Sequence, residues 1–193
     1  MQWVLVAALA VAAVYYFFTS DFYNLKCVIA HKDGKTYCVR DTRNLRQSAE
    51  LLAEAVSRMK EMVAHMGRKY PKDERVARLV ANFNPNRIVE TLPTSEYTAY
   101  SEDKGRKLAF CLRKDKDKSK LIDINTLMFV ALHELSHLMT KSIGHERDFW
   151  LNFKFMLKNA TDLGLYASVD YSKAPQEYCG MTISDNPLLD LKS

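Results

Sequence analysis

Residues 127–137 read Leu-Met-Phe-Val-Ala-Leu-His-Glu-Leu-Ser-His, an apolar run that ends in two histidines and a glutamate. The apolar part has no polar face, which in a globular domain predicts a helix buried in the core. On such a helix His133 and His137 lie on one face, because residues four apart have Cβ atoms about 5–6 Å apart. Buried polar groups need partners. One histidine alone would be interpreted as a core residue, but His133, Glu134 and His137 together predict a metal site.

The order of these residues also suits hydrolysis. Imidazole nitrogens bind zinc at about 2.0–2.1 Å, and His133 and His137 can both reach one ion. Glu134 lies one residue round the helix, so its carboxylate can reach a water at the open position of the ion. Zinc makes such a water acidic and polarises a carbonyl, while the carboxylate takes the proton and delivers it to the leaving amine. The pattern therefore predicts a zinc-dependent metallopeptidase with Zn²⁺ as its cofactor.

A catalytic zinc normally has three protein ligands, and His145 is the candidate for the third. Gly144 just before it permits the sharp reversal that would return the chain over the metal. The alternative interpretation is a surface histidine at the start of a helix. In that case Glu146 and Asp148 are the alternative ligands.

These residues resemble the signature of the WLM family of Wss1-like zinc metallopeptidases and of the related SprT-like proteases. The shared features are the His-Glu-x-x-His motif, His145 after a gap of seven residues, and Phe149-Trp150 one turn later. That gap is too long for a metzincin motif. The resemblance covers about residues 90–165 and implies a zincin-like fold. It also implies zinc ligands at His133, His137 and His145, with Glu134 as the general base.

The whole chain also resembles uncharacterised membrane-anchored proteins of large DNA viruses, most clearly in residues 93–101 and 178–181. WLM and SprT-like proteins often act on protein crosslinked to DNA through added binding modules, and this sequence shows no such module. The net charge is +5, but the basic stretch 113–120 alternates with acids and contains no aromatic residue. That pattern is typical of a solvated loop. We expect a polypeptide substrate and no nucleic acid as partner.

The first twenty residues contain no Asp, Glu, Lys or Arg, and residues 3–18 form an unbroken apolar run. As a helix, residues 1–19 would be roughly 28 Å long, close to the core of a thin bilayer. A cleaved signal peptide is the rival interpretation, but bulky residues 15–18 occupy the place of its small cleavage-site residues. We therefore expect a single-pass membrane anchor. Lysines follow the run between residues 26 and 35, so the positive-inside bias predicts a catalytic domain on the cytoplasmic side.

A chain of 193 residues has room for one domain with a hydrophobic core. Periodicity and turn signals predict strands at 25–30 and 36–40, helices at 45–70, 73–83, 123 or 125 onward and 146–163, a hairpin at 97–112 and an irregular tail. The predicted class is α+β. The predicted division is a 1–20 transmembrane anchor, a 21–43 hairpin or linker, a 44–187 zincin-like metallopeptidase domain and a 188–193 tail.

The four cysteines, Cys27, Cys38, Cys111 and Cys179, include no Cys-x-x-Cys pair. This excludes a zinc ribbon and a thioredoxin-type redox site. Cys27 and Cys38 could face each other across a hairpin, and their disulfide state depends on the compartment. Cys179 is interpreted as a buried thiol rather than as a group that caps the zinc.

Together these features predict a membrane-anchored zinc metallopeptidase whose oligomeric state the sequence does not predict. Two alternatives are a catalytically inactive zinc-binding membrane adaptor and a DNA-associated Wss1-like protease. Residues 107–112 are expected to lie at a sheet edge and to bind substrate as an added strand. A phenol is expected to stabilise the oxyanion, with Tyr166, Tyr97 and Tyr100 as candidates.

Overall fold

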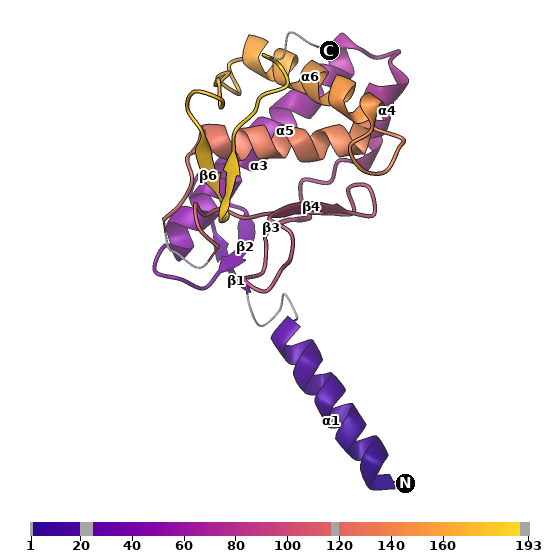
Figure 1. Cartoon of the computed structure of the whole chain (residues 1–193), viewed down its shortest axis with the longest axis vertical. Coiled ribbons are helices and arrows are strands. Elements are labelled where there is room, and N and C mark those ends of the chain that lie inside the picture. Colours follow the sequence, from indigo (N-terminus) through magenta and orange to yellow (C-terminus); the bar gives the residue numbers. More distant parts are fainter. Residues whose placement is uncertain (1, 20–24, 117–119, 190–193) are drawn as a thin grey trace.

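The helix that carries the histidines lies at the centre of the computed structural model, which describes residues 2–19, 25–116 and 120–189 (Figure 1). The helices are α1 (Gln2–Thr19), α3 (Leu45–Lys69), α4 (Glu74–Asn82), α5 (Ile124–Met139) and α6 (Arg147–Asp162). The strands are β1 (Leu25–Ile29), β2 (Thr36–Arg40), β3 (Ile88–Glu90), β4 (Ala99–Glu102), β5 (Lys107–Phe110), β6 (Gln176–Tyr178) and β7 (Met181–Ile183). The α+β class and the predicted positions of the helices and of strands β1, β2, β4 and β5 are confirmed.

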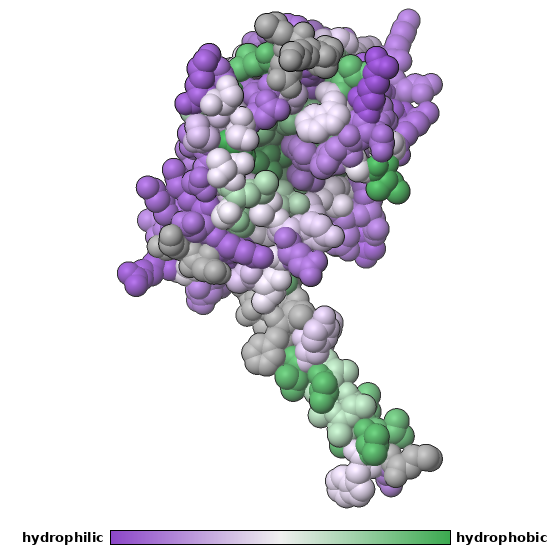
Figure 2. Space-filling view, viewed as in Figure 1, coloured by the Kyte–Doolittle hydropathy of each residue, from purple (hydrophilic) through white to green (hydrophobic). Residues whose placement is uncertain are grey.

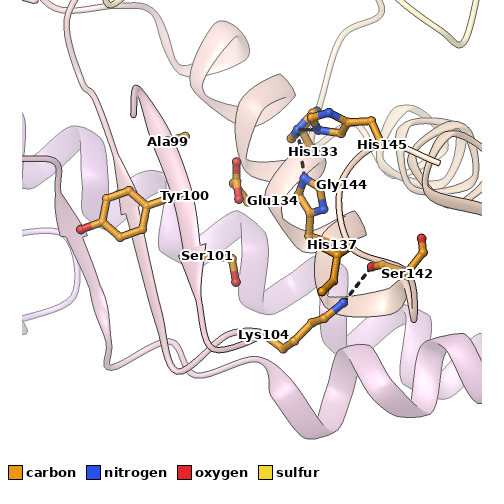
Figure 3. A pocket seen from close by; sticks show the side chains of 11 residues that line it. Ala99, Tyr100, Ser101, Lys104, His133, Glu134, His137, Ser142, Gly144 and His145 are labelled. Carbon is orange, nitrogen blue, oxygen red and sulfur yellow. Dashed lines mark hydrogen bonds between the residues drawn. The ribbon is translucent and has the colours of Figure 1, made fainter. Parts of the chain in front are cut away.

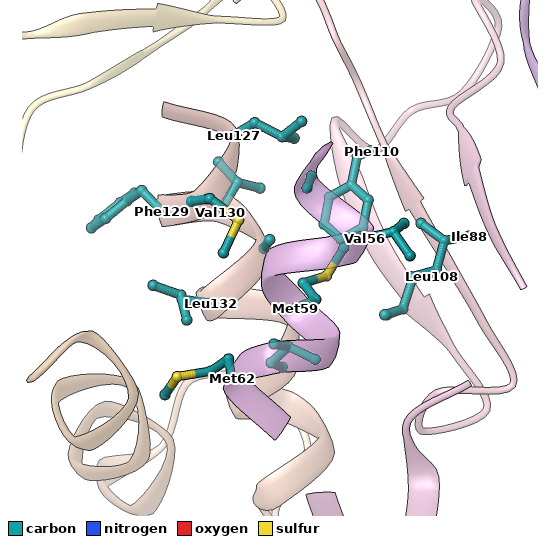
Figure 4. Close-up of a cluster of buried hydrophobic side chains, with 14 of the residues drawn as sticks. Val56, Met59, Met62, Ile88, Leu108, Phe110, Leu127, Phe129, Val130 and Leu132 are labelled. Atoms are coloured by element: carbon teal, nitrogen blue, oxygen red, sulfur yellow. The ribbon is translucent and has the colours of Figure 1, made fainter. Parts of the chain in front are cut away.

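Helix α5 is apolar over most of its surface because other elements cover it there. It contacts α3, α4, α6, β4 and β5. The amphipathic helix α3 supplies a stripe of fully buried side chains, including Met59 and Met62, between α5 and the sheet (Figure 4). Burying one such side chain contributes about 1.5–3 kcal/mol. This packing holds α5 firmly in place and fixes the direction in which its polar residues point.

The main sheet has three strands in the order β3-β5-β4. Strand β3 pairs parallel to β5, with Ile88 opposite Leu108, and β4 pairs antiparallel to β5, with Tyr100 opposite Ala109. Since β5 has a neighbour on both sides, the expectation that residues 107–112 form an open edge is wrong. The edge strands of this sheet are β3 and β4, and β4 also contacts α5. Periodicity identifies a strand in the sequence but does not say which strands lie beside it.

Strands β1 and β2 form an antiparallel hairpin that belongs to the same core as the helices. Cys27 pairs with Cys38 in its register, and the two form a disulfide. Ala30, Tyr37 and Val39 are buried in the cluster that also contains the apolar faces of α3 and α5. The hairpin therefore contributes to the packing of the domain.

A buried ion cluster joins this hairpin to the main sheet. The Glu90 carboxylate is fully buried and accepts hydrogen bonds from the Arg40 backbone nitrogen at 2.7 Å and from Arg113 Nε at 3.1 Å. Arg40 Nε also donates to the carbonyl oxygen of Thr91 at 2.7 Å. Burial raises the pKa of Glu90, and the Arg113 and Arg40 guanidiniums oppose that shift. Removing one member would leave a buried charge unpaired, which is strongly destabilising.

A short C-terminal hairpin, β6–β7, lies where the sequence indicated an irregular tail. Its tight turn places Cys179 and Gly180 in the left-handed region, with φ of 52° and 80°. Cys179 forms a disulfide with Cys111, and its backbone nitrogen donates to the Arg113 carbonyl at 2.8 Å. The interpretation of Cys179 as a free thiol is therefore wrong. Strands of three residues are too short to show a period, so the sequence pattern missed them.

The structure contradicts the predicted transmembrane anchor at helix α1. In the part of the chain that the structure describes, no helix is both long and apolar enough to cross a bilayer. The predicted transmembrane anchor is wrong, and so are the membrane as a partner and the single-pass location with a cytoplasmic catalytic domain. Trp3 and Leu9 of helix α1 are exposed, and Figure 2 shows that much of the helix surface is hydrophobic.

Candidate metal centre

Two of the three histidines of the candidate site, His133 and His137, lie on α5. Asp123 caps this helix, accepting from the backbone nitrogen of Thr126 at 2.9 Å and from its hydroxyl at 2.6 Å. The next three turns are buried against the core, so the helix presents His133 and His137 on the one face that opens to a cavity. Their Nε2 atoms lie 3.3 Å apart.

A tight loop after α5 brings in the third histidine. Helix α5 ends at Met139, Gly144 takes a φ of 81°, and α6 begins at Arg147. This reversal places His145 Nε2 at 3.0 Å from His133 Nε2, although the residues are twelve apart in the chain. One nitrogen from each of the three rings lies within 4.8 Å of the others, so they could hold a metal ion (Figure 3).

Two of the three nitrogen separations are close to those around a zinc ion. A tetrahedral ion with metal–nitrogen bonds of about 2.0–2.1 Å places two ligand nitrogens about 3.3 Å apart, and the two measured separations are 3.3 and 3.0 Å. The rings of α6 complete the surroundings. Phe149 stacks on His137 at 4.3 Å between centroids and meets His133 edge-on at 4.8 Å. The aromatic residues that the sequence analysis noted after His145 therefore form one wall of the cluster.

Burial keeps two of these imidazoles neutral. Burial, reinforced by His137 and His145, lowers the pKa of His133 to about 3. Burial, with His145 and Lys104, lowers the pKa of His137 to about 4. Neutral imidazole is the form that binds a metal. Protons therefore compete little with a metal for these two rings at neutral pH.

Glu134 lies beside the cluster rather than within it. Its side chain is on the adjacent face of α5, between the histidines and β4 (Figure 3), and only 5% of the residue is exposed. Burial raises the pKa of its carboxyl to about 7. A carboxyl group with a pKa near neutrality can both take and return a proton.

Two cavities meet at this point, and both are lined by Ala99, His133, Glu134 and His145. The first measures about 320 Å³ and extends toward Ser101, Lys104 and Ser142. The second measures about 400 Å³ and extends toward hairpin β6–β7. Volumes of this size are typical of ligand-binding clefts. The edge strand β4 therefore runs along a cleft that continues on both sides of the histidines.

Lys104 holds the loop that carries His145. Its Nζ donates to the carbonyl oxygens of Thr140, Lys141 and Ser142 at 3.0, 3.3 and 2.9 Å. A cation is favourable at this helix C-terminus, where the last carbonyls lack partners. Lys104 has a φ of 54° in the β4–β5 turn. No motif in the sequence singled it out, because its three partners are backbone atoms far along the chain.

The alternative ligands do not join the cluster. Asp148 instead accepts a hydrogen bond from the Ser142 hydroxyl at 2.6 Å and so helps to hold the loop. Glu146 is exposed at the N-cap of α6. Among the described residues, the His/Cys/Asp/Glu group with the spacing of a metal site is His133, His137 and His145.

The tyrosines predicted to serve the oxyanion lie elsewhere or point elsewhere. Tyr166 is buried and its hydroxyl accepts from the Asn186 side chain at 3.1 Å. Tyr97 is 65% exposed, and the Tyr100 ring points away from the histidines (Figure 3). The tyrosine that lines the second cavity with Glu134 is Tyr178, which the sequence analysis did not consider for this role. Burial, together with the Glu134 carboxylate, raises the pKa of Tyr178.

Residues 80–184 match the family model described as the WLM domain, which is more than half of the 193 residues. This chain belongs to the WLM family. The match confirms the resemblance to Wss1-like proteins, a family grouped with the zinc metallopeptidases. All three histidines, Glu134, Lys104 and both cysteines of the Cys111–Cys179 disulfide lie within the matched region.

Three relatives of this WLM protein come from large DNA viruses, as the sequence resemblance implied. It is 32% identical over 160 residues to "Uncharacterized protein R325" of Acanthamoeba polyphaga mimivirus, covering 80% of each chain. It is 40% identical over 63 residues to "Uncharacterized protein 136R" of Invertebrate iridescent virus 6, covering 32% of this chain and 35% of the relative. It is 34% identical over 84 residues to "Uncharacterized protein 042R" of Invertebrate iridescent virus 3, covering 44% and 48%. No solved structure matches the chain.

Proposed function

We propose that this WLM-family protein is a zinc-dependent metallopeptidase in which His133, His137 and His145 hold the ion and Glu134 is the general base. One observation carries the proposal: three imidazole nitrogens gather within 4.8 Å at a cavity that Glu134 also lines. When bound, zinc would supply a Lewis acid for the scissile carbonyl and would lower the pKa of the attacking water.

The residues of this chain perform the proton transfers. The Glu134 carboxylate takes the proton of the attacking water and passes it to the departing amine, for which a pKa near 7 is well suited. The aromatic rings of Phe149 and Phe153 contact His133 edge-on and shield part of it from solvent. A dry site strengthens the interactions of its charged groups.

An extended polypeptide fits the cleft best as the substrate. Strand β4 is an edge of the sheet and lines the same cavity as the histidines through Ala99, Tyr100 and Ser101. Main-chain hydrogen bonds to a free edge hold a peptide with little dependence on its sequence. Substrate addition to β4 replaces the original hypothesis, which assigned this role to residues 107–112.

The inactive zinc-binding protein is the weaker alternative. Glu134 is only 5% exposed, and burial disfavours the charged form of its carboxyl group. Keeping this residue therefore lowers stability, which favours a catalytic role for it. A purely structural ion held by the three histidines would not need Glu134 beside it. No feature of the described residues favours the DNA-associated alternative.

The test uses the full-length chain loaded with zinc. Zinc content is measured by mass spectrometry and cleavage is measured on fluorescein-labelled casein, for wild type, Glu134→Gln and His145→Ala. We expect Glu134→Gln to keep zinc and to lose turnover by at least about a hundredfold, the usual contribution of a general base. His145→Ala should lose both.

Glu146→Gln is the matched control, because it makes the same chemical change at an exposed carboxylate next to His145. It should keep both zinc and turnover. Loss of zinc in Glu134→Gln would show that the assigned roles are wrong. Wild type that binds zinc without cleaving casein or a randomised peptide library would identify a zinc-binding protein instead.

A further inference from the structure

The cavity of about 400 Å³ beside the histidines has a character that the metal centre does not explain. Its walls combine buried residues of α5, Phe129 and Val130, with Met181 and Ile183 from the C-terminal hairpin. The cavity on the other side of the histidines is lined instead by Ser101, Lys104 and Ser142. The end of the cleft at Lys104 is therefore the more polar end, and the end at hairpin β6–β7 is the apolar end.

The charged groups at the apolar end have one sign. Among the described residues that line it, the acids are Glu134 and Asp185, and none is a lysine or an arginine. A carboxylate that entered would lose its hydrating water to an apolar wall, which is unfavourable. An apolar side chain would gain from burial there.

The outer wall of this cavity is fastened at several points. Tyr178 donates from its hydroxyl to the Thr98 carbonyl at 3.0 Å, just before the edge strand β4. Cys179 is bonded to Cys111, and the backbone nitrogens of Cys179 and Gly180 donate to Arg113 and Lys114 at 2.8 Å each. A wall held in this way is preformed, so a ligand does not have to order it on binding.

The direction of a bound peptide follows from β4. Antiparallel pairing is the more stable arrangement, and β4 runs from Ala99, which lines both cavities, toward Glu102 and the polar end. A peptide added antiparallel to β4 enters at the polar end and leaves past Ala99. The residues that follow the bond to be cleaved therefore lie at the apolar cavity.

We propose that this cavity binds an apolar side chain of the polypeptide substrate, contributed by the residue that follows the cleaved bond, and that hairpin β6–β7 sets this preference through Met181 and Ile183. The inference rests on the proposed function for the identity of the substrate. The cavity itself depends only on the described geometry, so its binding preference can be measured without turnover.

Two lysine substitutions on the same strand test the proposal. Ile183→Lys places a cation in the cavity wall, whereas Thr182→Lys places one on a neighbouring exposed residue that does not line it. Each full-length, zinc-loaded variant is given a randomised decapeptide library, and the cut sites are read by mass spectrometry. Wild type and Thr182→Lys should cut before apolar residues. Ile183→Lys should lose about tenfold or more in kcat/KM for those sites and gain sites followed by Asp or Glu.

A binding experiment separates this proposal from the proposed function. Zinc-loaded Glu134→Gln, alone or combined with Ile183→Lys or Thr182→Lys, is immobilised and the same library is passed over it. Enrichment of apolar residues that Ile183→Lys removes and Thr182→Lys keeps supports the cavity even if wild type cleaves nothing. A wild-type preference for Lys or Arg after the cut, or an unchanged profile in a folded Ile183→Lys, overturns the proposal. Circular dichroism of each variant establishes folding.

Discussion

The side-chain nitrogen of Lys104 donates a hydrogen bond of 3.0 Å to the carbonyl oxygen of Thr140. This contact joins the β4–β5 turn to the end of α5, just before the loop that returns the chain at His145. The same nitrogen donates to the next two carbonyls as well. One lysine thus orders the segment between the second and third histidines.

Replacing Lys104 with methionine should weaken zinc binding by about tenfold, the lower end of what supporting residues around a metal contribute. The loop would lose three hydrogen bonds, so His145 would spend less time beside His133. Competition with a chromophoric chelator measures the affinity. Lys141→Met is the matched control, because that side chain is 73% exposed and forms a long ion pair with Glu74 at 3.9 Å. Equal losses in both variants would contradict this role for Lys104.

Removing His145 should weaken zinc binding by more than about a hundredfold, because a ligand should count for more than the residues that support ligands. His133→Ala and His137→Ala should behave in the same way. His31→Ala provides the comparison, since His31 is exposed and lies in the turn of the β1–β2 hairpin. If His145→Ala bound zinc as tightly as wild type, the third ligand would have to be sought elsewhere.

The two disulfides should differ in what they stabilise. Chain-entropy arguments give at most about 4 kcal/mol for the Cys111–Cys179 link, which closes 68 residues, and about 3 kcal/mol for the Cys27–Cys38 link, which closes 11. Urea unfolding of the two paired serine variants measures this. Only the Cys111→Ser/Cys179→Ser variant should also alter the peptide preference, since it frees hairpin β6–β7. A changed preference in Cys27→Ser/Cys38→Ser instead would contradict the role of the hairpin.

The cap of the histidine helix should make stability depend on acid. Burial tends to raise the pKa of Asp123, but hydrogen bonds from Thr126 outweigh it and lower the pKa below its ordinary value of 3.8. A lowered pKa in the folded state stabilises the protein above pH 3.8, and this contribution is lost as the pH falls through the folded value. Asp123→Ala should therefore cost about 1 kcal/mol at pH 7 and less at about pH 2.5.

Asp123→Asn separates the charge from the cap, because asparagine keeps the capping oxygen and does not titrate. Its stability relative to wild type should be nearly unchanged at pH 7. Denaturant titration of both variants at the two pH values measures the effect. An equal cost of Asp123→Ala at both would show that the carboxylate charge has no part in capping α5.

The sequence predicted the features that depend on residues close together in the chain. The spacing of His133 and His137 on a helix predicted their common face, and Gly144 predicted the reversal that brings His145 back. The stripe of α3 predicted its buried methionines. Each of these inferences depends on residues within one or two turns of each other.

The remaining features depend on contacts between distant segments. Strand β5 is central because β3, which lies earlier in the chain, pairs with it on the side opposite β4. The Cys111–Cys179 bond spans 68 residues, and nothing near either cysteine indicates its partner. Lys104 and Tyr178 act through backbone carbonyls, which every residue carries. The apolar run at residues 3–18 was predicted from its composition to cross a membrane, whereas among the described residues no helix is both long and apolar enough to do so.

The Arg40–Glu90–Arg113 cluster has a practical consequence for anyone who trims this chain. The family match begins at residue 80, so a fragment cut there would keep Glu90 and Arg113. It would discard Arg40, one of the two arginines that contact the Glu90 carboxylate. It would also discard α3, whose methionines pack behind the histidine helix. The smallest fragment that can be expected to fold is therefore longer than residues 80–184, which match the family. It must begin no later than Leu25.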